Sequence, residues 1–271
     1  MNAVTSKTSL ALIVAIGLLT TPPVFAVDKD QQLIDQVQHY WGAQAKRDWN
    51  TMYGFLSPNE QATMTRAQYS EYLNKTTAFD YNNVQIKDKE IVDNMAWVAI
   101  EYDAKLILYP NAAPRHVQNW QLWQNTDTWH LIPSEQSQHY PRLPPKLRLA
   151  TEETALMQRA KDAWSAKSIQ DWKTFYSFLP SAYRTLVNLD SFLQKKSQYL
   201  YLNPNIDWAE VTQALKDKGL VEVSFAIKPN DPAASKLEPE PKNMLEKWFK
   251  QDGNWYIDVP LPTNKSASPK H

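Results

Sequence analysis

Residues 41–56 read WGAQAKRDWNTMYGFL, and residues 164–179 read WSAKSIQDWKTFYSFL. The two stretches lie 123 positions apart, and eight of their sixteen positions are identical. Before each stretch, apolar residues step by three and four positions, as on the buried face of an amphipathic helix. The chain is therefore predicted to contain two tandem copies of one domain.

Downstream of this repeat, both copies change from helical periodicity to strand alternation. Residues 96–102 and 219–225 are expected to direct successive side chains to alternate faces of a sheet, as half-buried strands do. Each copy then closes with a predicted hairpin, which turns at residues 125–128 in the first copy and at Asp252-Gly253 in the second. Helices followed by antiparallel strands predict an α+β domain with helices packed on one face of a sheet.

Helix caps account for several of the repeated polar residues. Asp48 and Asp171 fall where the first helix should stop and the second begin, so their carboxylates are expected to accept free backbone N–H groups. Thr65 and Asn188 are expected to cap the third helix in each copy, with Gln68 completing a capping box in the first.

The repeat also sets the expected domain boundaries. Domain 1 covers residues 27–137 and domain 2 covers residues 151–262. The Pro-rich segment 138–150 between them is expected to be a semi-rigid extended linker, and the polar tail 263–271 is expected to be disordered.

The N-terminus has the pattern of a secretory signal peptide, with cleavage expected after residue 26. Lys7 is followed by the apolar run 10–19, a break at residues 20–23 and the short side chains of residues 24–26. An N-terminal membrane anchor is the alternative, although the run is short for a bilayer span. The chain is cysteine-free, so a periplasmic protein without disulfides is expected, with direct secretion as the alternative.

Composition argues against several classes of function. Lys plus Arg equals Asp plus Glu at 29 each, so no net charge draws the chain to nucleic acid or anionic lipid. Only five glycines are present and none forms a phosphate-binding loop, so no nucleotide cofactor is expected. The five histidines lack metal-binding spacing, and no G-x-S-x-G element is present. We expect no cofactor and no metal site.

With this order of elements, both copies resemble the NTF2-like (SnoaL-like) superfamily. The resemblance lies in the opening helix with its tryptophan, the Asp-Trp-x-x-x-Tyr-x-x-Leu step at residues 48–56 and 171–179, and the final strands ending on Trp-x-x-x-Pro. It implies two cone-shaped domains, in each of which helices close over a strongly curved antiparallel sheet. The superfamily includes isomerases, dehydratases and hydrolases as well as non-catalytic binding modules, so the fold does not select a function.

Family enzymes use carboxylate, His, Tyr or Arg side chains that project into the cone. In domain 1 the weak catalytic candidates are Tyr53, Tyr102, His116 and His130. Strand alternation places Tyr102 on the apolar inner face and therefore Asp103 on the outer face. The two histidines are equally explained as partly exposed hydrogen-bonding residues.

Candidate ligand- or partner-binding residues are those that the second copy does not share: Trp97, Arg115, Trp120 and Trp123. The alignment places Leu220, Glu246 and Phe249 opposite the three tryptophans, and Tyr256 opposite His130. These aromatic groups could bind an apolar ligand, a sugar or a protein, or they could pack one domain against the other. We expect the domains to pair within the chain.

The leading hypothesis is a non-catalytic periplasmic module that binds a small apolar ligand or an envelope protein. The alternative is an isomerase, dehydratase or hydrolase with its active site in the cone of domain 1. A third hypothesis is a structural envelope protein that docks through Arg142, Lys146 and Arg148 of the linker. No nucleic-acid partner and no membrane span after signal cleavage are expected.

Overall fold

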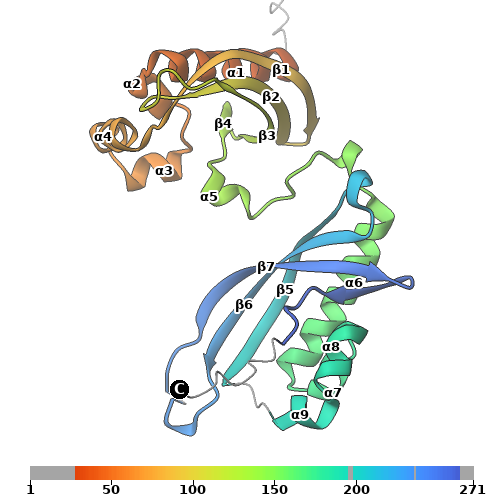
Figure 1. The fold of residues 1–271 in the computed structure, drawn as a ribbon. Coiled ribbons are helices and arrows are strands. Elements are labelled where there is room, and N and C mark those ends of the chain that lie inside the picture. Colours follow the sequence, from red (N-terminus) through yellow and green to blue (C-terminus); the bar gives the residue numbers. More distant parts are fainter. Residues whose placement is uncertain (1–27, 195–197, 235, 263–271) are drawn as a thin grey trace, which may run out of the picture.

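The computed structural model describes residues 28–194, 198–234 and 236–262, which form two domains with one order of elements (Figure 1). The expected signal peptide, residues 1–26, and tail, residues 263–271, lie outside the described residues.

Domain 1 consists of four helices followed by four strands. The helices are α1 (Lys29–Lys46), α2 (Trp49–Tyr53), α3 (Pro58–Thr63) and α4 (Arg66–Thr76). The strands are β1 (Phe79–Val92), β2 (Met95–Leu106), β3 (Arg115–Asn125) and β4 (Trp129–Leu131). Two short turns of helix follow, α5 (Ser134–Ser137) and η1 (Pro145–Leu147).

Domain 2 repeats this order. Its helices are α6 (Ala150–Ser168), α7 (Trp172–Tyr176), α8 (Ser181–Leu186) and α9 (Leu189–Gln194). Its strands are β5 (Tyr199–Val211), β6 (Lys218–Pro229), β7 (Glu240–Gln251) and β8 (Asn254–Ile257). Short 3₁₀ turns, η2 (Gln213–Leu215) and η3 (Pro232–Ala234), interrupt the strand connections.

The α+β fold is confirmed, with helices packed on one face of each sheet. Both sheets are antiparallel, in the orders β1-β2-β3-β4 and β5-β6-β7-β8. Figure 1 shows the sheet of domain 1 curling strongly, with α1 running along it. β1 and β5 each carry a register shift beside an asparagine with positive φ, Asn83 and Asn203. Such bulges increase the local bend and twist of a strand, so both copies curve their sheets in the same way.

The first helix of each domain packs on the inner face of its sheet. In domain 1 the core contains Leu33, Val37 and Trp41 of α1, with Val98 and Ile100 of β2. The equivalent positions of α6 and β6 form the core of domain 2. They are Leu156, Ala160, Trp164, Val221 and Val223. The hydrophobic periodicity of the sequence therefore identifies this layer correctly.

The predicted caps are confirmed. The carboxylate of Asp48 accepts from the N–H of Thr51 at 3.1 Å, and Asp171 makes the equivalent bond to Thr174 at 3.0 Å. Thr65 forms a complete capping box with Gln68. Asn188 accepts from the N–H of Ser191 at 2.9 Å. In each copy one extra short helix, α3 or α8, precedes the predicted third helix.

The strand register corrects the alignment of the third strands. Trp123 pairs with Leu131 and Trp248 pairs with Ile257, so Trp248 rather than Phe249 is the equivalent of Trp123. By the same register, Leu245 rather than Glu246 is the equivalent of Trp120. The paired positions that flank the second hairpin are one residue further apart in sequence than those that flank the first. An alignment that matches the last strands of the two copies therefore misplaces the third strands by one residue.

The linker, residues 138–150, is attached to domain 1 by specific contacts. The indole N–H of Trp97 donates to the carbonyl of Pro141 at 3.0 Å, and Tyr140 packs against the cluster that contains this tryptophan. The N–H of Lys146 donates to Glu90 at 3.1 Å, and its ammonium to Asp88 at 2.7 Å. These contacts place the linker on the face of the first sheet opposite α1.

The linker also attaches to domain 2. The N–H of Leu143 donates to the buried carboxylate of Glu210 at 2.8 Å. His139 Nδ1 lies 2.5 Å from Oε1 of Glu222, which is 3% exposed and also accepts from the indole N–H of Trp208 at 2.7 Å. Both carboxylates lie on the sheet face opposite α6, since their strand neighbours face the core. Buried carboxylates require such partners, so the linker completes this face of the second sheet.

Candidate functional site

A cavity of about 1330 Å³ lies in domain 1. Its walls come from α1 to α4, the start of β1, residues 119–122 of β3 and the segment that follows β4, including α5. Many of its lining side chains are aromatic, among them Tyr40, Tyr69, Tyr72, Phe79, Tyr81 and Trp120. Amide side chains supply further polar groups: Gln44, Asn119, Gln121, Gln136 and Gln138. A site of this size and composition suits an organic ligand or a peptide segment.

Charge is scarce in this cavity. Glu60 and Arg142 are the only charged side chains among its described lining residues. The carboxylate of Glu60 already accepts from the N–H and hydroxyl of Ser57 at 2.8 and 2.9 Å, and from the amide of Gln136 at 3.3 Å. The wall therefore offers mainly neutral hydrogen-bonding groups and aromatic surface.

The phenols of Tyr40 and Tyr69 in the cavity wall remain protonated at neutral pH. Burial, and to a smaller extent the nearby carboxylate of Glu60, raises the pKa of Tyr69 to about 12. Burial also raises the pKa of Tyr40, with smaller contributions from Tyr69, Tyr81 and Tyr102. These groups can donate hydrogen bonds to a ligand, but they are poor bases.

Tyr53 has a structural role. Its hydroxyl lies 3.0 Å from the carbonyl of Gln61 and 2.8 Å from that of Met64, which fastens α2 to the helices that follow. In domain 2 the hydroxyl of Tyr176 makes the equivalent contacts with the carbonyls eight and eleven residues further along the chain, at 3.1 and 2.7 Å. A role repeated in both copies is explained by folding.

The other catalytic candidates lie on different faces of the sheet. Tyr102 lies on the inner face, where its ring centroid is 5.0 Å from that of Trp41, and burial raises its pKa. His130 lies on the outer face and is buried, with Nε2 3.4 Å from Asp127 and with no hydrogen-bond partner for Nδ1 among the described residues. Tyr102 and the two histidines therefore form no common acid–base array.

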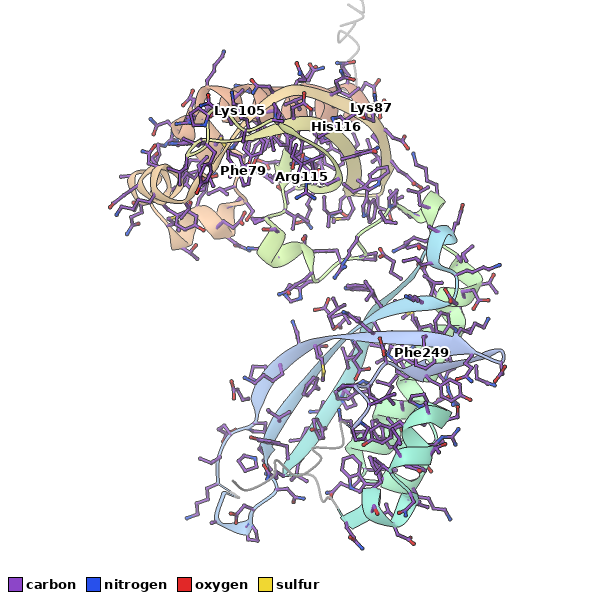
Figure 2. All side chains as sticks on the ribbon, in the orientation of Figure 1. Phe79, Lys87, Lys105, Arg115, His116 and Phe249 are labelled. Carbon is purple, nitrogen blue, oxygen red and sulfur yellow. The ribbon has the colours of Figure 1, made fainter. Side chains whose placement is uncertain are left out.

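His116, which is labelled in Figure 2, belongs to a polar network on the outer face of the sheet. Its Nδ1 lies 3.0 Å from Asp103 and its Nε2 3.7 Å from Glu101, which also pairs with Lys87 at 3.6 Å. The hydrogen bond from Asn83, and to a smaller extent that from His116, holds the pKa of Asp103 below its usual value. The histidine side chain is 64% exposed, and no group of three or more His, Asp or Glu in the described residues could hold a metal.

The predicted binding residues have separate positions. Trp97 is buried against the linker, as described above, and Trp123 is fully buried in the core. Trp120 lines the cavity and lies 5.8 Å from the ammonium of Lys146. Arg115 is exposed at the start of β3 (Figure 2). Of the four, Trp120 alone lines this cavity.

The basic residues of the linker are used largely within the chain. Lys146 pairs with domain 1, and the guanidinium of Arg148 lies 3.3 Å from Glu153. Arg142 lines the cavity. Docking of a partner through all three residues would require breaking these contacts.

A charged pair inside domain 2 was missed from sequence. Trp41 donates to Gln121 at 3.1 Å in domain 1, and Trp164 donates to Glu246 at the same distance in domain 2. Lys167 stands where domain 1 has Gln44, and its ammonium lies 4.0 Å from the ring centroid of Trp164. Two neutral residues are thus replaced by two charged ones. A sequence alignment that matches β3 with β7 in the correct register would have revealed this change.

Burial perturbs both members of this pair. It raises the pKa of Glu246 and lowers that of Lys167, while the attraction between the two opposes each shift. The ammonium also lies 4.2 Å from the ring centroid of Tyr201, so two aromatic faces enclose it. The chain's own lysine therefore occupies this aromatic site in domain 2.

No helix within residues 28–194, 198–234 and 236–262 has the length and apolarity needed to cross a bilayer.

Comparison with known proteins gives similarities to solved structures only. No protein-family model matches the sequence, and no curated protein matches it significantly. The chain is similar to an Ntf2-like protein involved in plasmid conjugation, at 8% identity and a TM-score of 0.29, over 87% of this chain and 99% of that one.

Two further structures match about one third of the chain. One is a calcium/calmodulin-dependent protein kinase type II association domain from Thiobacillus denitrificans, at 10% identity and a TM-score of 0.28, over 35% of this chain and 86% of that one. The other is a SEC-C motif containing protein from Rhodopseudomonas palustris, at 7% identity and a TM-score of 0.28, over 34% and 69%.

Proposed function

We propose that this chain is a non-catalytic binding protein and that the cavity of domain 1 holds an uncharged ligand. The observation that carries the proposal is the composition of the cavity wall, which is aromatic and amide-rich with two charged side chains. Aromatic faces and neutral donors bind neutral organic groups well, whereas a buried ionic ligand would lack a compensating partner. The scattered positions of Tyr53, Tyr102, His116 and His130 support binding over acid–base catalysis.

Fluorine NMR of protein labelled with 5-fluorotryptophan tests this proposal. The Trp120 resonance is assigned with Trp120→Phe, and the protein is screened against neutral and charged members of one compound series. We expect neutral aromatic amides and glycosides to shift the Trp120 resonance, and we expect Tyr72→Ala to weaken that binding.

Leu245→Ala is the matched control, because Leu245 is the register equivalent of Trp120 in domain 2. It should leave the binding unchanged. The proposal fails when no compound shifts Trp120, or when charged compounds bind better than their neutral counterparts.

We also propose that both domains are NTF2-like cones and that the mature chain acts in the periplasm. The repeated order of helices and the bulged, curved sheets support the family assignment. The signal-peptide pattern of residues 1–26 and the lack of cysteine support export. Intact-mass measurement on protein from a periplasmic extract should give a chain that begins at Val27. An uncleaved chain confined to the cytoplasm would contradict export.

A further inference from the structure

One edge of the sheet in domain 1 lacks a strand partner over most of its length. β2 pairs with residues 115–124 of β3, whereas β4 pairs only with residues 123–125. One further bond runs from the N–H of Ile132 to the carbonyl of Leu122, at 2.9 Å. The edge from Arg115 to Gln121 is therefore left without a neighbouring strand among the described residues.

The backbone direction along this edge follows from two hydrogen bonds. The carbonyl of Leu122 points toward β4, while the N–H of Asn125 points toward β2 and donates to Asn94 at 2.8 Å. Because β2 and β3 pair without a register shift, the alternation continues along the strand. His116, Gln118 and Trp120 thus direct their N–H and C=O groups outward, and within the described residues these groups have no hydrogen-bond partner.

The cavity lies along this same edge. Residues 119, 120, 121 and 122 all line it, although successive strand residues point to opposite faces of the sheet. A space bordered by both faces of a strand must run past its edge. Its far wall includes residues 132–134 and 136–138, so an occupant lies between β3 and this segment.

Domain 2 protects the start of the corresponding edge. The N–H of Asp258 donates to Lys247 at 2.8 Å, so the odd-numbered residues of β7 face outward. Pro241 stands at the position of His116 and has no N–H to offer. Glu240 and Lys242 flank it with charge. Proline and charge are the usual protections of an edge strand, and the central part of the edge in domain 1, residues 117–121, has neither.

We propose that the free edge of β3 binds an extended, uncharged peptide segment of another protein, which adds as a strand along this edge and enters the cavity at residues 119–122. This inference rests on the proposed function and names the class of its ligand. Main-chain bonds to His116, Gln118 and Trp120 supply affinity, and alternate side chains of the peptide contact the aromatic and amide walls. A second folded copy is a poorer occupant, because residues 132–134 and 136–138 line the cavity opposite residues 119–122 and favour a single extended chain there.

Phage display of random nonapeptides provides the test. Peptides are selected on the full chain and then measured for binding to Gln118→Pro, which removes one outward N–H without touching the β2 ladder. We expect selected peptides to be poor in charged residues and to bind Gln118→Pro about tenfold or more weakly than wild type. Gln118→Ala keeps the N–H and should change affinity less than threefold, by the same reasoning.

Two further measurements guard against misfolding and against other occupants. His116→Pro copies the proline that domain 2 carries at this position, so it should fold and should also weaken binding. Hydrogen exchange of the bound state should show protection at Gln118 and Trp120. Peptides that bind wild type and both proline variants equally, or no enrichment at all, would overturn the proposal.

The outcomes separate this inference from the proposed function. Compounds that shift Trp120 while no edge-dependent peptide is enriched would leave the binding cavity in place and remove the peptide. Concentration-dependent dimers that Gln118→Pro abolishes would assign the edge to a second copy and overturn the inference.

Discussion

Domain 1 and domain 2 have the same helices and inner sheet face, but they differ at the third strand and in one buried pair. Both keep the capping aspartates, the tyrosine that joins two helices and a buried tryptophan near the end of the third strand. Domain 1 has a neutral Gln44 and Gln121 where domain 2 has Lys167 and Glu246. The shared set maintains the fold, and the differences mark where the copies were free to specialise.

The largest predicted effect tests the register equivalence of the third strands. Trp123→Ala and Trp248→Ala should each destabilise the chain by about 3–5 kcal/mol, because both rings are almost fully buried. Denaturant unfolding followed by circular dichroism measures this loss. A Phe249→Ala variant that costs as much as Trp248→Ala would break the equivalence.

The next effect concerns the linker. Trp97→Leu introduces the residue that domain 2 has at this position and removes the N–H bonded to Pro141. We expect a loss of about 2 kcal/mol and faster proteolytic cleavage between residues 133 and 149. Leu220→Ala in domain 2 is the control, and it should leave the cleavage rate of the linker unchanged.

The shared tyrosines should behave alike. Tyr53→Phe and Tyr176→Phe each remove a hydroxyl that joins two backbone carbonyls, at a cost of about 1–2 kcal/mol. Thermal unfolding of the two variants checks the prediction. Loss of ligand binding in Tyr53→Phe without loss of stability would instead return this residue to the functional site.

The smallest effect is expected from the charged pair. Glu246 has a folded pKa above its usual 4.5, so its protonated form is favoured and stability falls as the pH rises through the folded pKa. Lys167 has a folded pKa below its usual 10.5, so stability falls as the pH drops below 10.5 toward that folded pKa. Both perturbed pKa values therefore lower the stability of the folded state near neutral pH.

Copying domain 1 should remove them. The double variant Lys167→Gln/Glu246→Gln should be neutral or more stable by about 1 kcal/mol at pH 7, with a flatter dependence on pH above 4.5. Denaturant unfolding across this range gives the slope. A steeper dependence in the double variant would show that the pair stabilises the fold as an ion pair.

The fold could be predicted from sequence because helix periodicity, strand alternation and caps are local signals. The cap at Asp48 and the inward position of Tyr102 are examples. The candidate site could not be predicted in the same way. It depends on where β4 stops pairing with β3 and on how the segment after β4 returns, and neither is encoded by one residue. A one-residue difference in hairpin length also misaligned the third strands. Glu246 was therefore not recognised as the equivalent of Gln121, nor Leu245 as the equivalent of Trp120.

The contacts of the linker have a consequence for the history of the chain. His139 and Leu143 bond to Glu222 and Glu210 of the second sheet, while Trp97 of the first sheet holds Pro141. Removing the first copy together with the linker would take these partners from Glu222 and Glu210 and uncover this face of the second sheet, and removing the second copy would leave His139 and Leu143 without these bonds. The linker has therefore joined the two copies into one unit, since each copy makes contacts with it that are lost when that copy is separated from it.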